Sequence, residues 1–534
     1  MKSMSRGLVI ALCRELALWS ILIVALLLCL SKFDSFQVGT YMDDAQYIVL
    51  AKSIATGPAY GLINTPDQVL PTRYPFGWPL MLAPIYALSG GSFQSLKLLS
   101  LLFTLANILM VRWCWSDLGI PDRLMALAVT ALYAFSPMTV SHSGMVMSEP
   151  AFTFWVLLGL AMTTKSAPKL GDHALSASLG VIWVFAAYVR TIGATFVIAS
   201  ALYLMLKRRW ARLVIATLVS LTTLAVVVAC TDIGWQDVVG IGEYLDQFYH
   251  PAKWGQGHIA SDIVSRGVQG ASEYIGVYLR DSLIPFIGSP RAQSLLRSFG
   301  LAPLSWLTSA MIFILVAGGY AASIRRCGLL VAHLFVPLFA VVTILWPFRG
   351  ERFLYGILPL LFGYLLLGGV EALRFFLGRI SHTARTRVAL HVWLSSGAVA
   401  LLLCAQLVRS ILIDDSLNHV RDFRVGSVWI KDNTPPDAVV VCEQPQAIYL
   451  YAQRATVQLQ DDPSALADIV TRQNPVYLLI APKLEWRHDG NLEYSAATQE
   501  VLKALQTDVL QGNLVFEDQK AMVRVFRLRS GVDR

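Results

Sequence analysis

The sequence predicts a polytopic α-helical membrane protein with a small α/β domain at its C-terminal end. Hydrophobic residues make up 55% of the 534 residues, and charged residues make up only 15%. A soluble domain carries roughly a quarter charged residues, so most of this chain is not expected to face water. The apolar residues also gather in runs of about 20, the length that crosses a membrane. Together these observations exclude an ordinary soluble enzyme.

The apolar runs predict about eleven transmembrane helices. The first, 16–30, follows basic residues as the core of a signal peptide does. No small-residue cleavage site comes after it and many further runs do, so we expect it to remain as the first helix. Two runs, 174–189 and 191–206, are short and have Arg190 between them. The predicted helices cover residues 15–31, 96–115, 123–140, 150–165, 174–189, 191–206, 211–231, 302–323, 327–346, 353–373 and 388–412.

The net charge of +8 follows the same pattern. Residues 1–414 hold 30 Lys and Arg against 19 Asp and Glu, whereas residues 415–534 hold 13 against 16. If the helices alternate from a cytoplasmic N-terminus, the basic turns between them all fall on the cytoplasmic side, as the positive-inside rule requires. An odd number of helices then places the C-terminal domain outside. The positive charge therefore predicts membrane orientation and no nucleic-acid partner.

Two domains are expected, a membrane domain over 1–414 and a small α/β domain over 415–534. Two large loops of the membrane domain, 32–94 and 231–302, fall outside, and helix-like runs such as 45–55 predict interfacial helices. The C-terminal part alternates helical and strand patterns over about 110 residues, a usual domain size. Its predicted helices cover 425–432, 464–471 and 497–510, and its predicted strands cover 438–442, 476–480, 514–517 and 522–528.

Neither the cysteines nor the histidines predict a metal site. Six of the seven cysteines lie in or beside apolar runs, and only Cys442 lies in the polar C-terminal part, so a disulfide framework is not expected either. His250 and His258, in the second large outer loop, could ligate a metal with nearby acids, but their spacing matches no motif. We expect no cofactor; a divalent metal ion is left open, although no pattern indicates one.

The acidic residues of the membrane domain indicate where a site lies, because fourteen of the 19 fall outside. Asp43 and Asp44 follow the first span at the start of an expected interfacial helix. Partial desolvation raises the pKa of a carboxyl group toward the working pH, so this pair could include a general base. The structural alternative is a capping box of Thr40 and Asp43. Tyr47, on the same segment, is a candidate for binding substrate.

The segment 73–80, RYPFGWPL, combines an arginine with aromatic residues before an apolar helix. Arg73 could pair with a phosphate, and Tyr74 or Trp78 could stack on a sugar ring. The structural alternative is a belt of aromatic residues at the membrane surface, before a helix that begins with a proline.

The segment 141–150, SHSGMVMSEP, enters the fourth predicted helix from outside. Ser148 is expected to cap this helix and Pro150 to lie in its first turn, which gives both a structural role. Glu149 is an ionisable group at the mouth of a span, where such groups tend to be functional. His142 is a further candidate for binding substrate.

Three arginines, Arg190, Arg349 and Arg352, lie on the outer side against the positive-inside preference. This placement suggests that they bind an anion, most simply a phosphate held by guanidinium groups. Snorkelling to anionic head groups would explain a single arginine. Three arginines on the same face as the acids favour a site.

Three segments in this order, YMDDAQY at 41–47, RYPFGWPLMLAP at 73–84 and SEP at 148–150, resemble the C-type (GT-C) membrane glycosyltransferases. The nearest likeness is to the bacterial relatives of protein O-mannosyltransferases and of the aminoarabinose transferase of lipid A. The resemblance covers about residues 1–400, and a C-terminal α/β domain is also usual in such proteins.

This resemblance implies a sugar donor on a polyprenyl phosphate and an acid of the first loop that activates the acceptor. Carried over, Asp43 is the base, Asp44 and Glu149 support or orient it, and Arg349 and Arg352 take the donor phosphate. Asp44 stands where many relatives have Glu, but it keeps the charge.

The predicted activity is therefore the transfer of a hexose or pentose, with inversion, to a hydroxyl of a lipid, glycan or protein. The expected location is a bacterial inner membrane, with the N-terminus cytoplasmic and the C-terminal domain periplasmic. The alternative is a transporter or flippase of lipid-linked sugars, which predicts inverted repeats and charges near mid-membrane; the sequence shows no repeat, and its acids gather outside. A scaffold whose C-terminal domain binds a partner would leave the outer acids and arginines without a purpose.

Overall fold

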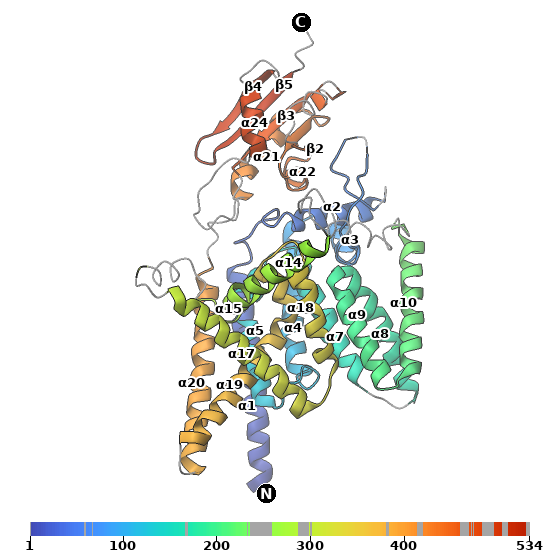
Figure 1. Ribbon diagram of the computed structural model, residues 1–534. Coiled ribbons are helices and arrows are strands. Elements are labelled where there is room, and N and C mark those ends of the chain that lie inside the picture. The colour runs from blue at the N-terminus through green and yellow to red at the C-terminus, as the bar shows by residue number, and fades with distance from the viewer. Residues whose placement is uncertain are drawn as a thin grey trace.

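A bundle of helices carries a five-stranded sheet domain on one end, and the N-terminus lies at the opposite end (Figure 1). The computed structural model describes all residues except 1, 58–59, 67, 166–168, 232, 235–258, 287–297, 299–301, 381–383, 414–419, 460–468, 471, 474, 483–495, 505–510 and 530–534. Helices α2 (Asp43–Thr56) and α3 (Gly77–Ser89) lie between the bundle and the sheet domain. The fold class predicted from the sequence, a polytopic helical membrane protein with a C-terminal α/β domain, is confirmed.

Each of the eleven apolar segments is helical. Their helices are α1 (Lys2–Ser31), α4 (Phe93–Trp113), α5 (Arg123–Ala134) with α6 (Pro137–Ser143), α7 (Glu149–Thr164), α8 (Lys169–Val189), α9 (Ala194–Leu206), α10 (Trp210–Cys230), α17 (Ala302–Cys327), α18 (Val331–Leu345), α19 (Leu358–Ile380) and α20 (Ala384–Ile411). Among the described residues, seven helices are long and apolar enough to cross a membrane, or eight if the pair α5 and α6, bent by 55°, counts as one span. The number eleven stays a prediction, because helices such as α9 and α18 are shorter.

Short elements connect these helices at the end that faces the sheet domain. They are the 3₁₀ helices η1 (Thr191–Gly193) and η3 (Glu351–Ile357), the helices α14 (Ile259–Glu273) and α15 (Leu279–Leu283), and the π-helix η2 (Tyr274–Tyr278) between α14 and α15. Helix α2, which the pattern over 45–55 predicts, belongs to this layer.

The bundle packs its central helices closely and exposes apolar side chains at its edge. Gly319 of α17 and Gly368 of α19 face each other's helices so closely that a Cβ on either would collide with the opposite backbone. Small residues at such contacts are typical of helices that pack within a membrane. The outlying helices α10 and α20 expose residues such as Leu221 and Trp393, which fits a surface that faces lipid.

The C-terminal domain is a mixed sheet with helices. Its elements are α21 (Val420–Asn433), β1 (Val439–Cys442), α22 (Pro445–Ala452), β2 (Ala455–Gln458), β3 (Val476–Ile480), α24 (Ala496–Ala504), β4 (Gln511–Asp518) and β5 (Val523–Arg529). The strand order is β2-β1-β3-β5-β4; β1 runs parallel to β2 and β3, whereas β5 runs antiparallel to β3 and β4. The four predicted strands are confirmed, but the pattern missed β2 and α22. Most of the predicted helix at 464–471 lies outside the described residues.

Candidate functional site

A cavity of about 420 Å³ lies where the ends of several helices meet. The start of α2, the segment before α3, the start of α7, and η1, α9, α18 and η3 all contribute to its lining. One end is polar and the other apolar. Seven of the residues predicted from the sequence as catalytic, phosphate-binding or substrate-binding line the cavity, and they come from separate motifs: Asp43, Tyr47, Arg73, Tyr74, Glu149, Arg190 and Arg352.

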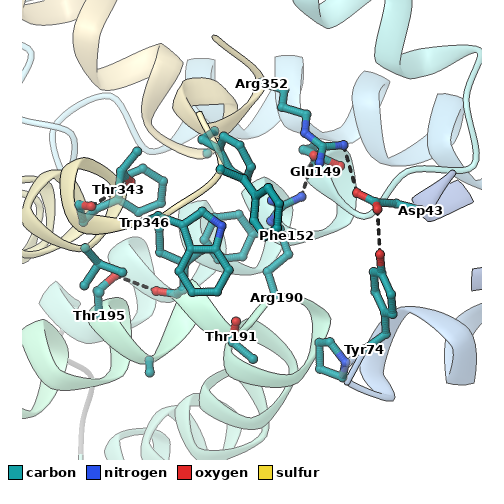
Figure 2. Close-up of a pocket in the computed structure, with 18 of the residues that line it drawn as sticks. Asp43, Tyr74, Glu149, Phe152, Arg190, Thr191, Thr195, Thr343, Trp346 and Arg352 are labelled. Carbon is teal, nitrogen blue, oxygen red and sulfur yellow. Dashed lines mark hydrogen bonds and ion pairs between the residues drawn. The ribbon is translucent and has the colours of Figure 1, made fainter. Parts of the chain in front are cut away.

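Asp43, the first residue of α2, faces the polar end of this cavity (Figure 2). Its Oδ1 accepts a hydrogen bond of 2.7 Å from the Tyr74 hydroxyl, and its Oδ2 lies 2.9 Å from Nη1 of Arg352. The side chain of Asp43 keeps 23% of its surface exposed. Both oxygens are therefore held in place while the carboxylate stays open to the cavity.

The turn before Asp43 differs from the predicted capping box. Thr40 donates its hydroxyl hydrogen bond to the carbonyl of Gln37, and the residue that caps α2 is Met42, which makes no side-chain cap. Met42 has φ +60°, a left-handed conformation that costs a non-glycine residue about 1–3 kcal/mol unless the surroundings enforce it. Contacts around this turn must therefore hold it in place.

Asp44 is one of those contacts. Its carboxylate is 1% exposed and accepts 2.9 Å hydrogen bonds from the backbone N–H groups of Gly39 and Ala45. Burial raises the pKa of this carboxyl group to about 7. Asp44 does not line the cavity, so its position suits a residue that fixes the turn.

Glu149, the first residue of α7, is 2% exposed and pairs with Arg190 at 2.5 Å. Pro150 lies at the second helical position, as predicted. Ser148 occupies the N-cap position of this helix, as predicted, but its side chain makes no capping hydrogen bond. The Ser148 hydroxyl lies 3.1 Å from the Tyr47 hydroxyl and accepts a 3.3 Å hydrogen bond from Arg190. Ser148 thus joins the second acid–arginine pair to the helix that carries Asp43.

Two other predicted site residues, Arg349 and Trp78, do not line this cavity. Arg349 lies outside it and pairs with Glu273 of α14 at 2.5 Å. Trp78 is fully buried and donates its indole N–H to the carbonyl of Val146, so it packs as a core residue.

His142 is buried and does not line the cavity. Its ring contacts those of Tyr41 and Tyr355, and its Nδ1 is 2.8 Å from the carbonyl of Met138. His250 and His258 lie outside the described residues. Across the part of the chain that the structure describes, no group of three or more His, Cys, Asp or Glu side chains is placed to hold a metal ion.

The apolar end of the cavity is the part that the sequence analysis missed. Phe152 of α7, Ile198 of α9, Phe339 of α18 and Trp346 line it. Ile198 is 51% exposed, so the apolar end extends toward the outer surface of the bundle. The one available signal was Trp346 itself, which ends a predicted span six residues before Arg352.

No family model and no curated protein matched the sequence. Solved structures matched along most of the chain. ArnT from Cupriavidus metallidurans in the apo state matches with a TM-score of 0.57 and 13% identity, over 98% of both chains. The same protein bound to undecaprenyl phosphate matches with a TM-score of 0.56 and 13% identity, over 95% of this chain and 97% of that one. The archaeal oligosaccharyltransferase AglB from Archaeoglobus fulgidus, in complex with an inhibitory peptide and a dolichol-phosphate, has a TM-score of 0.51 and 14% identity over 86% of this chain and 69% of its own. Taken with the bundle, the sheet domain and the order of the motifs, these matches show that the chain has the fold of the C-type (GT-C) membrane glycosyltransferases.

Proposed function

We propose that this protein is a glycosyltransferase that moves a sugar from a polyprenyl-phosphate donor to an acceptor hydroxyl, with inversion and with Asp43 as the base. The observation that carries this proposal is the cavity, which joins two acid–arginine pairs to an apolar end. A lipid phosphate has the same two parts, an anionic head and a hydrocarbon chain. Two proteins with this fold are known in complex with undecaprenyl phosphate and with a dolichol-phosphate.

In this proposal the donor phosphate lies against Arg352, and Arg190 and Arg73 also line the cavity. Guanidinium groups suit this task because their planar donors match phosphate oxygens. The polyprenyl chain then runs past Trp346 toward Ile198, where the lining is apolar and half exposed. Arg349 is occupied by Glu273 outside the cavity, so we assign it no contact with the donor.

Binding of the phosphate also frees the base. Asp43 contacts both Tyr74 and Arg352, and a phosphate competes with Asp43 for Arg352. Asp43 then takes the proton of the acceptor hydroxyl while that oxygen forms a bond to the anomeric carbon. The bond from the anomeric carbon to the phosphate oxygen breaks, and its electron pair leaves with the polyprenyl phosphate, whose charge the arginines stabilise. One displacement from the opposite face inverts the configuration.

The test uses purified protein in liposomes with a panel of polyprenyl-phosphate sugars and candidate acceptors, and it measures release of free polyprenyl phosphate. Wild type, Asp43→Asn and Asp432→Asn are compared, the last being an exposed aspartate on α21 that serves as control. We expect release by wild type and by the control, and loss of release in Asp43→Asn. Full activity in Asp43→Asn would remove Asp43 as the base. If no donor is consumed but the lipids cross the bilayer, the protein is a flippase.

We further propose that the membrane is a bacterial inner membrane, with the N-terminus cytoplasmic and the sheet domain periplasmic. The support for this orientation is the basic turns at the ends of the spans remote from the sheet domain, such as Arg325 and Arg326 at the end of α17. A protease added outside spheroplasts is expected to cleave the sheet domain; protection of that domain would reverse the orientation.

A further inference from the structure

The C-terminal domain contacts the membrane part on the segment that carries Asp43. The Tyr451 hydroxyl donates a 3.0 Å hydrogen bond to the carbonyl of Val38, five residues before Asp43. Lys52, on α2 itself, donates a 2.8 Å hydrogen bond from its Nζ to the Tyr449 hydroxyl. Both tyrosines belong to α22, which lies against α2 (Figure 1). One helix of the domain therefore holds the chain on both sides of Asp43.

Strand β2, at the edge of the sheet, makes a third contact, with the loop that follows α2. The backbone N–H of Thr456 in β2 donates a 2.6 Å hydrogen bond to the carbonyl of Asn64. In return, the Asn64 side-chain amide donates a 3.1 Å hydrogen bond to the Thr456 hydroxyl. Asn64 is 2% exposed. Strand β2 ends the sheet, and its free edge is thus bonded to the loop that follows α2. Hydrogen bonds between two residues that are 392 positions apart in the sequence therefore hold this loop.

These contacts bear on the one strained turn of the site. Residues 38–43 include Gly39 at φ +99° and Met42 at φ +60°. Strained backbone persists where the surroundings enforce it. Tyr451 holds the start of this turn through Val38, and α2 is a helix of 14 residues whose position Lys52 fixes about two and a half turns beyond Asp43. These contacts therefore restrain the backbone that carries Asp43.

We propose that the C-terminal domain is a positioning element for the base, with Tyr451 and Lys52 as positioning residues that act through Val38 and α2. The inference rests on the proposed function, since it assigns these residues a role in transfer. It gives the domain a part in catalysis that needs no acceptor bound to it. Misplacing a catalytic group by about 1 Å costs up to a hundredfold in rate, so the loss of these contacts should lower kcat.

The experiment compares wild type with the double variant Lys52→Met/Tyr451→Phe in the liposome assay. The phenylalanine keeps the ring contacts of Tyr451 with Phe93 and Phe423 and removes only the hydroxyl. The matched control is Arg524→Gln, which breaks the ion pair with Glu517 inside the sheet domain and touches neither α2 nor the loop. Hydrogen–deuterium exchange of residues 37–56 and 149–164 is measured on the same full-length samples.

We expect kcat of the double variant to fall by roughly tenfold with an unchanged KM for the donor, because the donor contacts stay intact. Exchange should rise in 37–56 and stay constant in 149–164, and the control should match wild type. Unchanged kcat with unchanged exchange would overturn the proposal, as would a rise in exchange over both segments, which signals general unfolding. If wild type consumes no lipid-linked sugar, the proposed function fails, and exchange confined to 37–56 still decides whether the domain holds this turn.

Discussion

The two sides of the first turn of α2 carry the same kind of side chain in opposite surroundings. Asp43 faces the cavity, is 23% exposed and pairs with Arg352. Asp44 faces the protein, is 1% exposed and binds backbone N–H groups of the turn. Asp43 can meet a substrate in the cavity, whereas Asp44 does not line the cavity and binds the backbone of the turn. Position on the helix, and not residue type, therefore separates the proposed base from the residue proposed to support it.

The largest expected effect breaks this comparison directly. Asp43→Asn keeps the shape of the side chain and removes its basicity, so kcat should fall by about 10²–10⁴-fold. Asp44→Asn leaves Asp43 in place and should keep most of the activity at neutral pH. Liposome turnover of both variants measures this. Equal losses in the two variants would mean that Asp44 also takes part in the proton transfer.

The second prediction compares two arginines that lie three residues apart. Arg352 is in the cavity and Arg349 is not. A hydrogen bond to a charged group contributes about 1.5–3 kcal/mol, so Arg352→Gln should raise the donor KM by roughly tenfold to a hundredfold. Arg349→Gln breaks the ion pair with Glu273 and the hydrogen bond to the Arg266 carbonyl, both outside the cavity, and should leave that KM unchanged. A larger rise for Arg349→Gln would place the phosphate nearer α14.

The sequence predicted what short-range patterns determine. Apolar runs placed the helices, and continuous buried runs placed β1 and β3, because burial on both faces needs no alternation. Asp43 was found as one of two adjacent carboxylates at the start of an expected interfacial helix, and Glu149 as an ionisable group at the mouth of a span. Arg190 and Arg352 were found as arginines that lie outside against the positive-inside preference.

Contacts between distant segments could not be predicted in this way. The separation of Arg349 from Arg352 arises because Arg352 lies in the 3₁₀ helix η3 while Arg349 precedes it and reaches a helix about 80 residues earlier. The bond from Thr456 to Asn64 joins segments with no shared pattern. Strand β2 has only four residues, two of them polar, so its pattern was too weak to recognise.

The third prediction sharpens the comparison through pH. Burial raises the pKa of Asp44 to about 7 in the folded protein, whereas an unfolded aspartate has a pKa near 3.9. Between these pH values Asp44 is protonated in the folded protein but not in the unfolded chain. Its contribution to the free energy of unfolding is therefore fully present below about pH 4 and is lost as pH rises to about 7. Asp44→Asn has no such charge. Its Tm relative to wild type should therefore rise by about 2–5 °C from pH 5 to pH 8.

The Asp44→Asn variant also replaces one carboxylate oxygen with an amide that cannot accept a hydrogen bond from Gly39 or Ala45. That cost does not depend on pH, so the pH dependence separates it from the charge effect. Thermal unfolding in detergent at several pH values gives both quantities. A constant difference in Tm across this range would mean that Asp44 stays charged in the folded protein.

The smallest expected effect concerns metal ions. The carboxylates of the cavity, Asp43 and Glu149, are each paired with an arginine, and a divalent cation would have to displace these guanidinium groups. The same arginines can stabilise the leaving phosphate, which is the task that a metal ion would otherwise perform. We therefore expect an excess of EDTA to leave turnover unchanged. Activity that EDTA removes and Mg²⁺ or Mn²⁺ restores would show that donor binding draws both arginines away and leaves the two carboxylates free to hold a cation. In that case the pairs seen here are the resting state of a metal site, and the comparison of Asp43 with Asp44 would separate a metal ligand from its support.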